Sequence, residues 1–208
     1  MHVQVSLITA EPQILAGCVR YLEDEVGPAL ETRPGSLGLS LLVAQEGDVA
    51  IVESFWATYD DFGLSAEFTA EVRRELARRV KRTVTAENYE VPVFEQRAPL
   101  RSGDAVRLTW VEAKLPGVLD VTEVYGDTAV PRLAESPGFR DALLFASPAR
   151  GHLISHTVWR DPAARAAGPN VAGIIRSGVL AEAGCEIRAI EDYSLVFSSA
   201  RKPTVPPS

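Results

Sequence analysis

The chain has 208 residues, of which 46% are hydrophobic and 24% charged, and its formal net charge is −7 with a pI near 5.1. This composition is that of a water-soluble globular protein with one large domain or two domains of about 100 residues. The acidic charge argues against a nucleic-acid binder, and no apolar run reaches the roughly 18 residues that cross a membrane.

The N-terminus and the cysteines indicate a cytoplasmic protein. The first residues, MHVQVSLITAEP, lack the basic start and the cleavage site of a signal peptide. Cys18 and Cys185 lie inside element patterns and not in a CxxC pair, which is typical of reduced core residues, although the sequence leaves a disulfide open. With only three histidines besides, we expect no dedicated metal site.

The first elements are predicted in chain order as a strand and a helix. Residues 3–10 alternate in polarity, which predicts a strand. A helix opens at Glu11-Pro12, because proline is tolerated in a first turn. Its buried stripe has three- and four-residue spacing and consists of Leu15, Cys18, Val19, Leu22 and Val26. Gly27-Pro28 is expected to end or kink this helix.

A hairpin follows between Pro34 and Trp56, with the sequence PGSLGLSLLVAQEGDVAIVESFW. Two apolar runs flank the turn signal Glu46-Gly47-Asp48. A second helix is predicted over 65–82 and a last strand over 85–95, where Pro92 indicates an edge position or a bulge.

The second helix carries two basic pairs, Arg73-Arg74 and Arg78-Arg79. They alternate with Glu71 and Glu75 along the chain. Such a pattern favours a solvated helix face over a phosphate site.

The whole order occurs twice, at a spacing of 103 residues. PGFRDALLFASPARGHLISHTVW, from Pro137 to Trp159, repeats the Pro-Gly turn, the hairpin and the final tryptophan of the first copy. The match needs no gap, and the helix positions Leu15, Cys18 and Leu22 align with Val118, Val121 and Tyr125. We interpret this pattern as an internal duplication.

Each half therefore has the order strand–helix–strand–strand–helix–strand of a ferredoxin-like unit. The predicted fold class is α+β, with two tandem ferredoxin-like (βαββαβ) units that form an intramolecular dimeric α+β barrel, a pseudo-dimer within one chain. The predicted domains are 1–97 and 104–198, joined by the polar segment RAPLRSGD. The tail 199–208 is expected to be disordered or to drape over the surface.

The stretches SPGFRDALLF and ISHTVW in 136–159, with the weaker copy in 34–56, resemble the antibiotic biosynthesis monooxygenase family. That resemblance implies the dimeric α+β barrel fold. The superfamily includes cofactor-independent monooxygenases that form quinones, haem-degrading enzymes and members with no known activity, so the resemblance is specific for fold and not for function.

The same resemblance allows a comparison with the residues that haem-degrading members use. Haem-degrading members use an Asn on the first strand and a His on the second helix, besides the strand Trp. Here Ser6 and Thr109 stand at about the depth of that Asn, and neither second helix contains a His. Haem binding or degradation is therefore the lowest-ranked hypothesis, and no cofactor is expected.

Four aromatic residues are candidates for binding a substrate. Trp56 and Trp159 end the third strand of each half and either cap the core or line a pocket for a planar aromatic ligand, with core capping favoured. Trp110 has no counterpart, because Leu7 occupies the equivalent position. Tyr59 is a candidate ligand-facing hydroxyl, although tyrosine is common at half-buried sites.

His156 and Glu53 are the candidate catalytic residues. They occupy equivalent positions three residues before Trp159 and Trp56, and alternation places them on the strand face opposite each Trp. Across the pseudo-two-fold axis they are expected to approach each other, and a His with a carboxylate partner can act as a general base. A hydrogen-bonded buried pair without catalytic role is the favoured alternative.

Two functional hypotheses follow, in addition to the haem hypothesis. The first is a cofactor-independent monooxygenase-like protein that acts on a small aromatic or polyketide-type molecule. The second is a non-enzymatic barrel that binds a small hydrophobic ligand. A cavity with His156 or a Tyr pointing in favours the first, and a cavity without a titratable group favours the second. The sequence leaves open whether two chains pair further as a homodimer.

Overall fold

The computed structural model describes residues 1–114, 117–169, 171, 173 and 185–202. The chain divides into two compact units. Unit 1 consists of Met1–Tyr89 with Leu195–Ser208, and unit 2 consists of Glu90–Ser194. Among the helices so described, none is long and apolar enough to cross a membrane.

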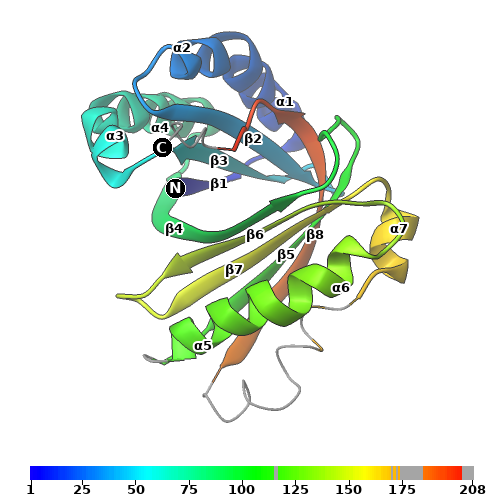
Figure 1. Ribbon diagram of the computed structural model, residues 1–208. Helices are drawn as coiled ribbons and strands as arrows, with labels where there is room; N and C mark the ends of the chain where they lie inside the picture. The colour runs from blue at the N-terminus through cyan, green and yellow to red at the C-terminus, as the bar shows by residue number, and fades with distance from the viewer. Residues whose placement is uncertain (115–116, 170, 172, 174–184, 203–208) are drawn as a thin grey trace. The chain divides into compact units, whose positions relative to one another are not determined.

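The elements of the first half follow the predicted order. They are β1 (His2–Thr9), α1 (Pro12–Tyr21), the π-helical turn η1 (Leu22–Val26), α2 (Gly27–Glu31), β2 (Ser36–Ala44), β3 (Val49–Trp56), α3 (Tyr59–Leu64), α4 (Ala66–Val80) and β4 (Thr85–Gln96). In unit 1, α1, α2 and α4 cover one face of the sheet formed by β1, β3 and β2 (Figure 1).

The elements of the second half repeat this order. They are β5 (Ala105–Glu112), α5 (Gly117–Val124), the π-helical turn η2 (Tyr125–Ala129), α6 (Val130–Ala134), β6 (Phe139–Ser147), β7 (His152–Trp159), α7 (Pro162–Ala167) and β8 (Glu186–Ser198). From β5 to α7, every element except α5 begins 103 residues after its counterpart, which is the spacing of the repeat in the sequence. Of the predicted second helix of this half, only residues 171 and 173 are described, and both are helical.

The strands are hydrogen-bonded in the order β1-β3-β2-β8-β5-β7-β6-β4, which closes on itself as a barrel. In unit 1, β3 pairs antiparallel with both β1 and β2, and in unit 2 β7 pairs likewise with β5 and β6. Two strands belong to both units: β4 pairs with β6 from Glu90 onward, and β8 pairs with β5 up to Ser194. The predicted α+β fold of two ferredoxin-like repeats is confirmed.

The chain end of β8 completes the sheet of unit 1. The amide of Ser199 donates to the carbonyl of Leu39, and the amide of Arg201 to that of Leu37, both at 2.9 Å. The described part of the predicted tail 199–208 is thus held along β2, and residues 203–208 lie outside the described residues. The boundaries predicted at 97 and 104 follow the sequence repeat, whereas the compact units share β4 and β8.

The first helix does not stop at Gly27-Pro28. Regular α-helical bonding ends at Tyr21, a π-helical turn follows, and α2 continues from Gly27. The amide of Gly27 donates to the carbonyl of Leu22, five residues back. This wider turn places Pro28 in the first turn of α2, where its missing N–H is tolerated.

The predicted helix 65–82 is α4, and a separate short helix, α3, precedes it because a capping box starts a helical turn at Thr58. Thr58 Oγ1 accepts from the amide of Asp61 at 3.1 Å, and the amide of Thr58 donates to the Asp61 carboxylate at 3.1 Å. The register of β4 against β6 shifts between Glu90 and Val93, which confirms the irregularity predicted at Pro92.

Candidate ligand site

Unit 1 contains a cavity between its sheet and its helices. The space open to the centres of water molecules is about 30 Å³. The lining comes from β1, β2, β3, η1, α2 and α4 and consists of Gln4, Ser6, Leu22, Val26, Leu30, Leu39, Val52, Ser54, Phe68, Thr69, Val72, Arg73 and Leu76. A space of this size holds one or two water molecules.

The lining is mostly apolar and has no proton-transfer group. It contains no carboxylate, histidine, cysteine or tyrosine, and Arg73 supplies its one charge. The polar side chains come from both the strands and α4, and consist of Gln4, Ser6, Ser54, Thr69 and Arg73. Gln4 donates to Asn88 of β4 at 3.1 Å. The lining of this cavity is thus apolar with a few polar side chains.

Trp56 ends β3 on the face that carries the cavity-lining Ser54. Its side chain is fully buried and stacks edge-on against Phe62 of α3, with ring centroids 6.2 Å apart. Its Nε1 has no hydrogen-bond partner among the described residues. A buried indole N–H without an acceptor is uncommon, because desolvating it is unfavourable.

Unit 2 replaces this apolar lining with hydroxyl groups. Tyr125 stands at the position of Leu22, and Ser155 at the position of Val52. The Tyr125 hydroxyl donates to the carbonyl of Leu143 at 3.1 Å and accepts from Ser155 at 3.2 Å. Burial raises the pKa of Tyr125 well above its usual range, so this hydroxyl stays protonated and serves as a structural donor.

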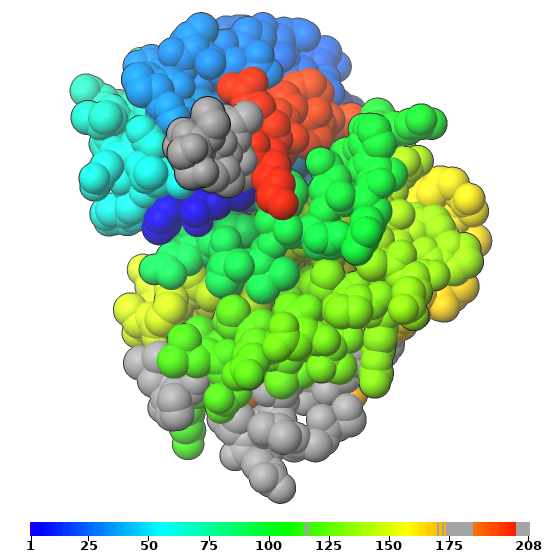
Figure 2. Space-filling view, viewed as in Figure 1, coloured from blue at the N-terminus to red at the C-terminus, as the bar shows by residue number. Residues whose placement is uncertain are grey.

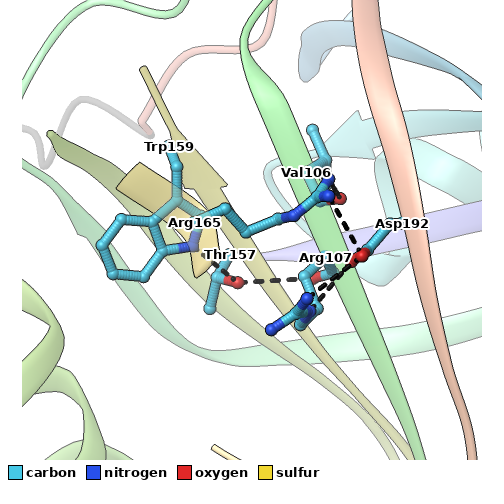
Figure 3. Close-up of polar contacts among 6 residues, drawn as sticks. All are labelled: Val106, Arg107, Thr157, Trp159, Arg165 and Asp192. Carbon is cyan, nitrogen blue, oxygen red and sulfur yellow. Dashed lines mark hydrogen bonds and ion pairs between the residues drawn. The ribbon is translucent and has the colours of Figure 1, made fainter. Parts of the chain in front are cut away.

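An arginine–carboxylate network lies beside Trp159 in unit 2 (Figure 3). Asp192 of β8 accepts from Arg107 at 2.8 and 3.0 Å and pairs with Arg165 of α7 at 3.1 Å. Trp159 Nε1 donates to Thr157 at 3.3 Å, so this indole, unlike Trp56, has an acceptor. Burial lowers the pKa of Arg165 and the neighbouring Asp192 raises it.

The predicted catalytic residues are both buried. Glu53 is 0% and His156 2% exposed. In each unit the terminal Trp packs with the helix-side core, so by alternation Glu53 and His156 face the other side of their strands. His156 lies 5.8 Å from Phe145, centroid to centroid. Burial lowers the pKa of His156 to about 4, so its imidazole is neutral at pH 7.

The other two predicted binding residues are elsewhere. Tyr59 opens α3 at the surface, where it is 62% exposed, and the atoms of α3 form the cyan edge in Figure 2. Trp110 lies on β5, and its Nε1 donates to Glu191 of β8 at 2.7 Å. Glu191 also accepts from Tyr193 at 2.9 Å. Neither Tyr59 nor Trp110 lines the unit 1 cavity.

Sequence reasoning missed a buried acid, Asp141 of β6. It is 1% exposed and is in register with Gln96 of β4 and Val158 of β7. Its Oδ1 has no hydrogen-bond partner among the described residues. Burial, with a smaller contribution from the Glu95 charge, raises the pKa of Asp141 to about 8. The signal was present in the repeat, because Asp141 replaces Gly38 in an otherwise apolar strand.

Comparison with known proteins supports the fold assignment. A search against protein-family models found no match. The uncharacterized protein Rv2558 of Mycobacterium tuberculosis is 26% identical, covering 98% of this chain and 86% of that protein. A candidate monooxygenase of Lactobacillus acidophilus superposes with a TM-score of 0.70 at 14% identity over 96% of this chain and 94% of its own. The chain has the dimeric α+β barrel fold of monooxygenase-like proteins.

The same fold hosts different chemistries among the solved structures. An anthrone oxidase-like protein has a TM-score of 0.66 at 14% identity, covering 95% of this chain and 92% of its own. A haem-degrading enzyme of Listeria monocytogenes has a TM-score of 0.52 at 10% identity, covering 92% and 98%. The barrel fold therefore leaves the reaction to be argued from the residues.

The unit 1 cavity does not fit a haem. Helix α4 carries no histidine, and the lining offers no histidine, cysteine, methionine or tyrosine that could hold the iron. Within the described ranges, no group of three or more His, Cys, Asp or Glu side chains is placed to hold a metal ion.

Proposed function

We propose that the first half of the chain binds a small apolar, ring-containing molecule in the helix–sheet cavity of unit 1. The observation that carries this proposal is the apolar lining, interrupted by few polar side chains and free of proton-transfer groups. A cavity without a titratable acid or base favours ligand binding over catalytic turnover. A ring-sized ligand exceeds the present space, so its entry requires movement of α4, where Phe68, Val72 and Arg73 are only partly buried.

The test uses the neutral fluorescent probe N-phenyl-1-naphthylamine, which brightens in apolar surroundings. We expect saturable binding that Val72→Phe weakens by about tenfold or more, because the new ring occupies the ligand space. Val19→Phe is the matched control, since Val19 packs against the unit 1 core without lining the cavity. Equal affinities of the two variants, with both folded by circular dichroism, would place the ligand elsewhere and refute the proposal.

Oxygenation of a ring-containing substrate, at a site apart from the helix–sheet cavity, is the second candidate function. It is supported by the fold shared with an anthrone oxidase-like protein. In this reaction a base removes a proton from the ring CH₂, the carbanion adds O₂, and loss of water leaves a quinone. His156, with Glu53, remains the proposed base, because a neutral imidazole can accept the proton. Both residues face the side of their strands opposite the helix–sheet cavity, so this reaction requires a substrate on that other side.

Oxygen uptake with anthrone as substrate tests this second candidate. One O₂ is consumed for each anthrone converted to anthraquinone and water. We expect His156→Ala and Glu53→Gln to lower kcat by about 10²-fold or more while probe binding is retained. Turnover that survives both substitutions would remove these residues from the mechanism, and absence of turnover with intact probe binding would leave binding as the function.

A further inference from the structure

The C-terminal end of α4 carries a basic groove on the surface of unit 1. The groove has a volume of about 480 Å³ and is lined by Arg73, Arg74, Ala77, Lys81, Arg82, Thr83 and Val84. Four of these seven residues are cations and none is an acid. The chain as a whole has a net charge of −7, so this groove departs from the general electrostatics of the protein.

The groove cations are not used in ion pairs within the protein. Glu75 of α4 accepts from Arg78 at 2.7 and 2.8 Å and from Arg79 at 2.7 Å. In the described part of the chain, by contrast, no hydrogen bond or ion pair involves the side chains of the four groove cations. Arg74 is exposed and Arg73 partly exposed, so the solvated helix face stays the sequence prediction for both arginine pairs.

The helix dipole explains the positions of only two of the four groove cations. Cations near a helix C-terminus are favourable because the last carbonyl groups are partly negative, and this covers Lys81 and Arg82, which follow the last residue of α4. Arg73 and Arg74 lie about two turns earlier, beyond the reach of that effect. The helix dipole therefore leaves these two arginines free to interact with an anion outside the helix.

Arg73 connects the groove to the ligand cavity. It is the one side chain that lines both, so the apolar space and the cationic groove share a wall. Arg73 is therefore the side chain that a ligand admitted by movement of α4 would meet in both places. Arginine is suited to this role, because its planar fork matches a carboxylate or phosphate with two hydrogen bonds.

We propose that the ligand of unit 1 is a small amphiphilic anion, with an apolar ring in the cavity and a carboxylate, phosphate or similar group in the basic groove. This inference rests on the proposed binding function and names its ligand class.

A pair of probes that differ in one charged group tests the proposal. 8-Anilino-1-naphthalenesulfonate carries the ring system of N-phenyl-1-naphthylamine plus a sulfonate. We expect the unaltered protein to bind the sulfonate more tightly, and Arg74→Gln/Arg82→Gln to weaken it about tenfold while the neutral probe is unaffected. Added NaCl should reduce the preference, because the groove is open to solvent.

The control variant Arg20→Gln/Arg78→Gln removes the same charge outside the groove. Equal loss of sulfonate binding in both double variants would show a general charge effect and overturn the inference. Failure of the unaltered protein to bind the sulfonate more tightly than the neutral probe would also overturn the inference. If the neutral probe still binds in that case and Val72→Phe still blocks it, the cavity proposal survives alone. Groove-dependent binding to vesicles of phosphatidylglycerol without any probe preference would assign the groove to a membrane surface instead.

Discussion

The buried acid Asp141 predicts a pH dependence of stability that can be worked out from the structure. Its pKa is raised from 3.8 to about 8, mainly because burial disfavours the carboxylate. The folded protein therefore keeps a proton that the unfolded chain releases above its ordinary pKa. The contribution of Asp141 to the free energy of unfolding is fully present below about pH 4 and is lost as the pH rises towards 8.

The magnitude follows from the size of the shift. A shift of about four units corresponds to at most about 6 kcal/mol of unfolding free energy over the full range, at 1.36 kcal/mol per unit. His156 acts in the opposite direction, because its lowered pKa of about 4 removes stability as the pH falls from 6.5. Between pH 6.5 and 8 the contribution of Asp141, about 2 kcal/mol, is the larger of the two, because the histidine of the unfolded chain is only half protonated at pH 6.5.

The assay is urea unfolding at pH 6.5 and pH 8 for the unaltered protein and for Asp141→Asn. The free energy of unfolding of the unaltered protein should fall by about 2 kcal/mol across this interval. Asp141→Asn keeps the shape of the side chain without its charge, so its free energy of unfolding should hardly change with pH and should exceed that of the unaltered protein at pH 8. Leu144→Asn, a polar change on the helix-side face of β6, should destabilise at both pH values. If Asp141→Asn retained the full pH slope, the assignment of the raised pKa to Asp141 would be refuted.

Two further predictions concern matched pairs within the repeat and the α3 cap. Trp159→Phe should destabilise by about 1 kcal/mol more than Trp56→Phe in urea unfolding, because only Trp159 donates a hydrogen bond, to Thr157; equal losses would contradict this reading. Asp61→Ala should cost about 1 kcal/mol through loss of the capping box, while Asp60→Ala, which lacks those bonds, should stay within about 0.5 kcal/mol. Thermal melts of the two aspartate variants check the second, and similar melting temperatures would disprove it.

Local patterns were sufficient for the architecture. The alternation in 3–10 and the three- and four-residue spacing from Leu15 to Val26 predicted a strand and a helix that the structure contains. The repeat at 103 residues added the second half and hence the barrel. This succeeded because burying one face of each element imposes a period that can be read along the chain.

Local detail was harder to predict where a side chain competes with the backbone. The capping box of Thr58 and Asp61 begins a separate short helix, and a π-helical turn carries the first helix past Gly27-Pro28. Both depend on single hydrogen bonds that hydrophobic periodicity does not report. Helix boundaries are correspondingly less certain than helix existence.

The sequence by itself determined that two copies of one α+β unit exist and that Trp56 and Trp159 are equivalent. Only the tertiary structure decided that their surroundings differ, with an apolar cavity in unit 1 and hydroxyl and arginine networks in unit 2. Likewise, only the fold buried Asp141 and placed Arg73 in the lining of both the cavity and the groove. The physical reason is that polarity and pKa depend on neighbours distant in sequence, which a local pattern cannot contain.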